Sequence, residues 1–92
     1  MSVYVDPLFF HTGSRTRSQC HMYADTIEEL QSMAETLKLD ENSFQDASAI
    51  GFPQYELTRT QRGLAVQAGA IQHSSSQRLM FKRRLAKFTK SL

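Results

Sequence analysis

Opposite charges are segregated along this chain of 92 residues, and the segregation limits how it can fold. Residues 78–92 carry six basic side chains and no acidic one, whereas residues 1–77 carry five basic and nine acidic side chains; the net charges of +6 and −4 sum to the formal +2 of the chain. A chain of this size buries only about 60–65% of its unfolded surface, so it supports a single hydrophobic core. We therefore expect one acidic domain, residues 1–76, and a basic C-terminal extension, residues 77–92.

Alternation of apolar and polar residues predicts two or three short strands. Residues 3–5 are β-branched or aromatic, and a proline at position 7 is typical of a strand that has ended. Residues 20–24 alternate with a period of two, so Cys20, Met22 and Ala24 are expected to face the core, and the other face is left to His21, Tyr23 and Asp25. Residues 70–73 are a candidate third strand.

Two helices are predicted between these strands. Apolar residues recur at helical spacing over residues 27–37, after a capping signal at residues 25–26. A second capping box pairs Thr58 with Gln61 and begins a helix that Gly69 ends in a left-handed conformation.

The remaining segments are polar and rich in turn-forming residues. Residues 40–54 are expected to be an ordered connection, to which we assign no element, and residues 74–77 are typical of a linker. The predicted fold class is therefore α+β: a small two- to three-stranded sheet packed by two helices, plus a basic amphipathic C-terminal helix.

The C-terminal helix is predicted to begin at Leu79. Its apolar stripe consists of Phe81, Leu85, Phe88 and Leu92, and the cations around it are Arg78, Lys82, Arg83, Arg84, Lys87 and Lys90. The stripe can pack on the domain or on a second copy as a homo-oligomer, the cations can bind nucleic acid, or the helix can rest on a membrane surface. Packing on the domain is the default, because each buried apolar side chain contributes about 1.5–3 kcal/mol. It leaves the cations outward, where they can bind a polyanion.

Five segments occur in the order and spacing of a known family: Val3–Asp6, Cys20–Thr26, Glu28–Leu30, Gln54–Thr58 and Ala65–Ala70. On these segments the chain resembles a small family of bacterial and phage domains of unknown function, domain of unknown function 4031, over roughly residues 3–73, with the basic tail beyond the shared region. Members share a V-x-V-D opening and an H-Y-D-L/V-T turn, where this chain has Gln54 and Glu56 in place of the histidine and the aspartate. Some members are joined to a hydrolase of phosphate esters, so the resemblance implies nucleotide or nucleic-acid biology.

Asp6, His21, Asp25 and Glu56 form a candidate polar cluster if the first two strands are neighbours. Carboxylates with an imidazole can hold a divalent ion or perform acid–base chemistry, so a metal-assisted hydrolase using Asp6, His21 and Asp25 is one alternative function. We favour the plainer interpretation, in which Asp25 caps the first helix, Asp6 caps backbone N–H groups at a strand end, and His21 is half-buried. No H-E-x-x-H or C-x-x-C spacing supports a metal centre, and Cys20 is expected in the core.

A second group of residues is typical of an anion site. It consists of Arg15, Arg17, His21, Tyr55, Arg59 and Arg62. A helix that begins after Thr58 offers free N–H groups and the positive end of its dipole to a phosphate. The alternative is that these arginines are solvated or pair with carboxylates.

We therefore expect a non-enzymatic binding protein of bacterial or phage origin that recognises a phosphate-bearing partner, either nucleic acid or nucleotide. The alternative from another class is a protein-interaction module, a phage factor that docks on a host protein through the C-terminal helix. A single cysteine, and no apolar run near the roughly 20 residues that span a bilayer, predict a cytoplasmic protein without a membrane span. No cofactor is predicted.

Overall fold

The computed structural model describes residues 2–10, 18–45 and 52–90, and their side chains except those of Phe10 and residues 85–90. The described residues form a mixed sheet of six strands: β1 (Val3–Val5), β2 (Phe9–Phe10), β3 (Ser18–Ala24), β4 (Phe44–Gln45), β5 (Gln54–Thr58) and β6 (Ile71–Gln72). Their order is β4-β5-β3-β1-β6, and β2 pairs with the first residues of β3. The α+β fold class is confirmed.

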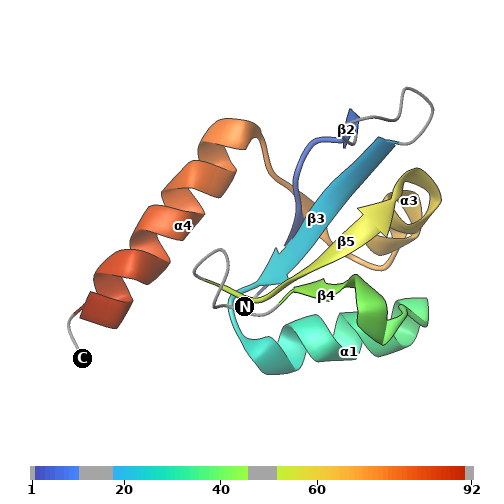
Figure 1. Ribbon diagram of the computed structural model, residues 1–92, viewed down its shortest axis with the longest axis horizontal. Helices are drawn as coiled ribbons and strands as arrows, with labels where there is room; N and C mark the ends of the chain where they lie inside the picture. The colour runs from blue at the N-terminus through green and yellow to red at the C-terminus, as the bar shows by residue number, and fades with distance from the viewer. Residues whose placement is uncertain (1, 11–17, 46–51, 91–92) are drawn as a thin grey trace.

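Four of the strands point the same way. β1, β2 and β5 are all antiparallel to β3, and β6 is parallel to β1, so these four strands end on the same side of the sheet, where β3 begins. We call this side the carboxyl end of the sheet. Figure 1 shows β2 and the starts of α3 (Arg59–Gln67) and α4 (Ser75–Lys90) there.

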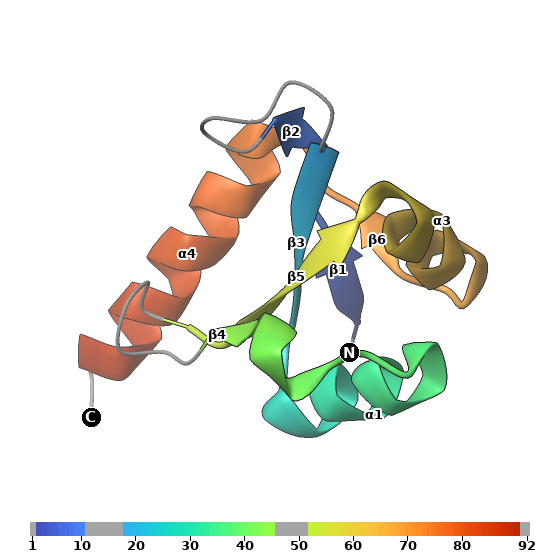
Figure 2. The same ribbon diagram turned by 45° about the vertical axis from the view of Figure 1, so that its right-hand side comes forward.

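Helices cover both faces of the sheet. α1 (Ile27–Leu37) and α3 lie on one face and α4 lies on the other, as Figure 2 shows most clearly. A short 3-10 helix, η1 (Glu41–Ser43), precedes β4. The predicted caps are confirmed: the Thr26 side chain accepts from the Glu29 N–H at the start of α1, and both bonds of the capping box at Thr58 are present.

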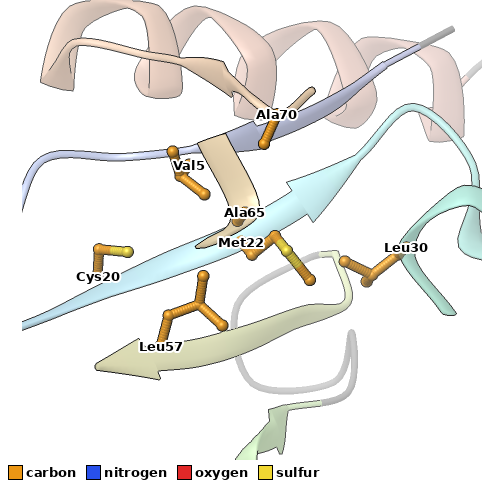
Figure 3. Packing of buried hydrophobic residues seen from close by; sticks show 7 residues of the cluster. All are labelled: Val5, Cys20, Met22, Leu30, Leu57, Ala65 and Ala70. Atoms are coloured by element: carbon orange, nitrogen blue, oxygen red, sulfur yellow. The ribbon is translucent and has the colours of Figure 1, made fainter. Parts of the chain in front are cut away.

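The main core lies between the sheet and the α1–α3 layer. It consists of Val5, Cys20, Met22, Leu30, Leu57, Ala65 and Ala70, whose side chains converge in Figure 3. The predicted inward face of β3 is thereby confirmed for Cys20 and Met22, which are fully buried. The chain turns out of α3 at Gly69, whose φ of 110° is the conformation in which glycine is favoured.

A second core lies under α4, so our expectation of a single hydrophobic core was wrong. Tyr23, Phe52 and Phe81 are buried together, and Tyr4 packs against them. The ring of Phe81 lies 4.9 Å from that of Tyr23 and 5.5 Å from that of Phe52, measured between ring centroids. Both faces of β3 are therefore covered, although its alternation predicted one inward face.

The sheet is larger than the predicted two or three strands. β4 and β5 fall where we expected a connection and a turn, and β2 falls where we predicted no element. β5 pairs along β3 from Gln19 to Met22, so hydrogen bonds to a central strand stabilise a segment with little strand pattern of its own.

The start of the C-terminal helix also differs from the prediction. α4 begins at Ser75 rather than Leu79, so residues 75–77 are helical and not a linker. Ser74 and Gln77 exchange hydrogen bonds: the Ser74 N–H donates to Gln77 Oε1 (2.7 Å) and the Gln77 N–H to Ser74 Oγ (3.2 Å). This arrangement satisfies helix-start N–H groups, and the serine run therefore starts a helix.

The buried Phe81 yields a stability prediction. We expect Phe81→Ala to lower the free energy of unfolding by about 3–5 kcal/mol, because it leaves a cavity between α4 and the sheet. Met80→Ala is the matched control; Met80 is 68% exposed, so its truncation is expected to change stability by about 0.5 kcal/mol or less. Urea unfolding of the two variants measures both values, and equal effects would contradict the packing of α4.

Candidate functional site

Asp6 is a buried carboxylate at the carboxyl end of the sheet. It follows β1 directly and is 5% exposed. Its Oδ1 accepts from the backbone N–H of His21 (2.6 Å), and its Oδ2 lies 2.9 Å from Nδ1 of the same residue. Because an ionised carboxylate only accepts hydrogen bonds, His21 Nδ1 is the donor in this contact. Asp6 thus fixes the orientation of the His21 ring.

Arg78 connects this carboxylate to α4. Its Nη1 lies 3.6 Å from Asp6 Oδ2, and its Nη2 donates to Gln54 Oε1 (2.9 Å). The guanidinium carbon lies 5.1 Å from the ring centroid of Tyr23 and 5.2 Å from that of Phe52, within the range of a cation–π contact. Arg78 is therefore held between a carboxylate, an amide and two aromatic rings.

The polar contacts continue across the sheet to β4. Gln54 Nε2 donates to Gln45 Oε1 (2.5 Å), and Gln45 Nε2 donates to Glu56 Oε1 (2.9 Å). His21 and Glu56 stand opposite each other in the pairing of β3 with β5. We call the connected residues Asp6, His21, Arg78, Gln54, Gln45 and Glu56 the Asp6 network.

Two more residues border the network at the carboxyl end. Arg62, in the second turn of α3, donates from Nε to the backbone oxygen of Asp6 (2.9 Å) and from Nη2 to Gln72 Oε1 (3.3 Å). The ring of Phe9 stacks on that of His21, with centroids 5.1 Å apart, and Phe9 is 38% exposed. One guanidinium group and an imidazole therefore contact the Asp6 carboxylate, and a second guanidinium group binds the backbone oxygen of the same residue.

The structure divides the predicted polar cluster. Asp6 and His21 are in contact, and Glu56 joins them through the network. Asp25 lies at the opposite end of β3, where it accepts from the Ser2 N–H (2.8 Å), the Tyr4 hydroxyl (3.0 Å) and Arg84 Nη2 (3.3 Å). It does not cap α1, whose N-cap is Thr26. The metal-assisted hydrolase with Asp6, His21 and Asp25 as one centre therefore has no assembled site in the described residues.

The predicted anion site is likewise assembled in part. Arg62 and His21 both contact Asp6, whereas Arg59 is exposed at the first residue of α3. Tyr55 packs on Phe44 on the α1 side of the sheet, the face opposite to His21. Arg15 and Arg17 lie outside the described residues.

Cys20 is confirmed as a core residue. It is fully buried, and burial, with the nearby negative charge of Asp6, raises the pKa of its thiol to about 12. A thiol that stays protonated at neutral pH is a poor nucleophile. Among the described residues, no group of three His, Cys, Asp or Glu side chains is placed to hold a metal ion.

The cations of α4 have two different environments. Arg78 pairs with Asp6, and Arg84 pairs with Asp25 at 3.3 Å, so two of the predicted polyanion contacts are engaged within the fold. Lys82 and Arg83 are exposed. The side chains of Lys87 and Lys90, and those of Leu85, Phe88 and Leu92 in the predicted stripe, lie outside the described residues. Phe81, the first residue of that stripe, packs on this chain's own sheet.

A cavity of about 300 Å³ lies between β1 and α4. It is lined by Tyr4, His73, Gln77, Met80, Phe81 and Arg84. We did not predict this site, because His73 was assigned only to a strand end. The sequence did contain a signal for it: residues 77, 80 and 84 are three or four positions apart, so they lie on one side of a helix.

Four residues of the Asp6 network, Asp6, His21, Gln54 and Glu56, lie on segments that we had matched to a family by resemblance. The chain belongs to the family described as "Protein of unknown function (DUF4031)". The family model matches residues 3–85, so it contains the Asp6 network and α4 as far as Leu85. Our expectation that the shared region stops near residue 73 and leaves the tail outside was therefore wrong.

Other comparisons add no relative to this DUF4031 chain. Neither a curated protein nor a solved structure matches it. Within the described ranges, no helix has the length and apolar character needed to cross a membrane.

The Asp6 network yields a prediction on coupling. We expect Arg78→Met to lower the free energy of unfolding by about 1–3 kcal/mol, because Gln54 loses a charged donor and Asp6 loses a nearby cation. In a double-mutant cycle with Asp6→Asn, we expect a coupling energy of about 0.5–3 kcal/mol between the two residues. The exposed Arg83→Met is the control, expected within about 0.5 kcal/mol of the parent protein. Additive effects of Arg78→Met and Asp6→Asn would contradict the contact.

His73 yields a prediction on pH. Its Nδ1 lies 2.8 Å from the Tyr23 hydroxyl, which keeps its proton because burial raises the pKa of Tyr23 to about 12. Burial, and then the charge of Arg84, lower the pKa of His73 below its usual 6.5, although Asp25 opposes this shift. The unfolded chain therefore binds a proton at a higher pH than the native protein. The resulting stability is present above about pH 6.5 and is lost as pH falls through the native pKa.

The measurement is an NMR titration of the His73 ring together with urea unfolding at about pH 7.5 and pH 5. We expect a His73 midpoint below 6.5, and a smaller loss of stability at low pH in His73→Asn than in the parent protein, since the other histidines are common to both. A His73 midpoint at or above 6.5 would refute the prediction.

Proposed function

We propose that this DUF4031 protein is a non-enzymatic binding protein for a phosphate-bearing partner, a nucleic acid or nucleotide, in a bacterial or phage cytoplasm. The observation that carries the proposal is the surface of α4. From Ser75 to Lys90 the helix has no acidic residue, and Phe81 anchors it on the sheet while Lys82 and Arg83 stay exposed. A cation row fixed on a rigid surface attracts phosphate without the entropy cost of ordering a free tail.

The carboxyl end of the sheet supports the same proposal. Four strands of one direction end there, and α3 and α4 begin there on opposite faces. In open α/β sheets, ligands bind outside the carboxyl ends of strands where the helices pass to opposite faces, and helix starts favour anions. Arg62 is positioned at this end by the backbone oxygen of Asp6 and Arg78 by its carboxylate, so Asp6 serves to hold cations in place rather than to perform chemistry.

Because Arg78 and Arg84 pair with carboxylates of this chain, we assign fewer cations of α4 to contacts with the phosphate-bearing partner. Lys82 and Arg83 supply the direct attraction, and Arg84 keeps donors free because its guanidinium has five N–H groups and bonds Asp25 through one nitrogen. With two phosphate contacts, affinity is expected to fall about seven- to twelvefold between about 50 and 200 mM salt, and each further contact increases this loss.

The proposal predicts a specific loss of binding in a charge-matched pair of variants. Fluorescence anisotropy with labelled single-stranded DNA, RNA, duplex DNA and a labelled nucleotide, at low and high salt, measures affinity and its salt dependence. We expect the double variant Lys82→Gln and Arg83→Gln to lose about tenfold or more in affinity at low salt. Lys38→Glu, at the exposed C-cap of α1, also lowers the net charge by two and is expected to lose less than about threefold.

Equal losses in the two variants would show that only net charge matters and would refute a site on α4. The absence of salt-sensitive binding to every probe would refute the proposed function itself.

A further inference from the structure

The cavity between β1 and α4 is walled by aromatic rings in fixed positions. The rings of Tyr4 and His73 are stacked, with centroids 4.2 Å apart and planes 22° apart, and the ring of Phe81 lies 5.4 Å from that of Tyr4. His73 is held by the Tyr23 hydroxyl and Phe81 by the second core. The aromatic surface is therefore ordered before any ligand arrives, which lowers the entropy cost of binding.

The α4 side of the cavity carries adaptable and polar groups. Met80 is 68% exposed, and its unbranched thioether can move to cover a flat ligand. Gln77 accepts the Ser74 N–H through Oε1, so its Nε2 is a donor at the cavity. Arg84 lies over the Phe81 ring at 5.3 Å and is bound to Asp25, which positions its guanidinium at the cavity wall.

Size and chemistry together narrow the class of ligand. A volume of about 300 Å³ is at the small end of the range for small-molecule sites, which suits one planar ring system rather than a large cofactor. Stacked aromatic side chains beside an arginine are the combination that proteins use to bind bases and their phosphates. Exposed cations at Lys82 and Arg83 lie on the same helix.

We propose that this cavity binds a nucleobase, with the base against the rings of Tyr4, His73 and Phe81 and its phosphate at Arg84. The inference rests on the proposed function, because the group bound in the cavity is the base of the proposed phosphate-bearing partner. A base paired within a duplex is not available for stacking in a cavity, so the ligand is a free nucleotide or an unpaired base of a single strand.

The experiment compares probes with and without a base, by calorimetry or NMR titration of the full chain. The probes are adenosine monophosphate and uridine monophosphate, ribose 5-phosphate, and a short single-stranded oligonucleotide with an abasic counterpart. We expect the base to raise affinity about fivefold or more. If only the oligonucleotide shows this gain, the source of the base is a single strand; a gain in the monophosphates identifies a free nucleotide.

Met80→Glu and Leu79→Glu are a matched pair for locating the base. Both residues are exposed apolar positions in α4, and the variants change the charge equally, but only Met80 lines the cavity. We expect Met80→Glu to bring the affinity ratio of base-containing to abasic probe close to one, and Leu79→Glu to preserve the ratio of the parent protein. Circular dichroism of both variants checks that α4 remains folded.

The outcomes separate this inference from the proposed function. Salt-sensitive binding in which base-containing and abasic probes bind equally would overturn the cavity site and leave the proposed function standing. An equal ratio in Met80→Glu and Leu79→Glu would also overturn the cavity site. Failure of every probe to bind would overturn both.

Discussion

The contact of Arg78 with Asp6 and Gln54 joins the basic C-terminal helix to the sheet, and the other features of the α4 face depend on it. It brings one positive charge of α4 to a buried carboxylate of the acidic part of the chain. Three residues later, Phe81 fills the space over Tyr23 and Phe52. The ionic contact orients the helix. The aromatic contact supplies most of the favourable free energy of packing, because the attraction within a buried ion pair does little more than offset the cost of removing its charges from water.

Some of the basic side chains of the C-terminal segment are therefore paired with acidic side chains inside the fold. Arg78 and Arg84 are each paired with an aspartate at opposite ends of β3, and Lys82 and Arg83, between them in sequence, are exposed. Two arginines thus fix where α4 lies, and the cations between them are available to a partner. The same division explains the two candidate surfaces, since the Asp6 network forms around Arg78 and the aromatic cavity is bordered by Arg84.

The Asp6 network also joins β5 to α4 and β4. Gln54 accepts from Arg78 of α4 through its amide oxygen and donates to Gln45 of β4 through its amide nitrogen. An amide can do both because it carries an acceptor oxygen and a donor nitrogen. Glu56, also in β5, accepts from Gln45. Polar side chains of β5 thus connect α4 to β4 in one set of hydrogen bonds.

Local signals in the sequence determined the caps and the turns. The box of Thr58 with Gln61 and the left-handed Gly69 were predicted correctly, and the cap of α1 was narrowed to Asp25 or Thr26, because each depends on residues within one helical turn. The inward placement of Cys20 and Met22 followed from alternation along one strand. Only the tertiary structure decided that β2, β4 and β5 exist, that Tyr23 is buried under α4, and that Asp6 meets His21 while Asp25 lies apart. These features depend on pairing and packing between residues distant in sequence, which the order of residues in any one segment does not encode.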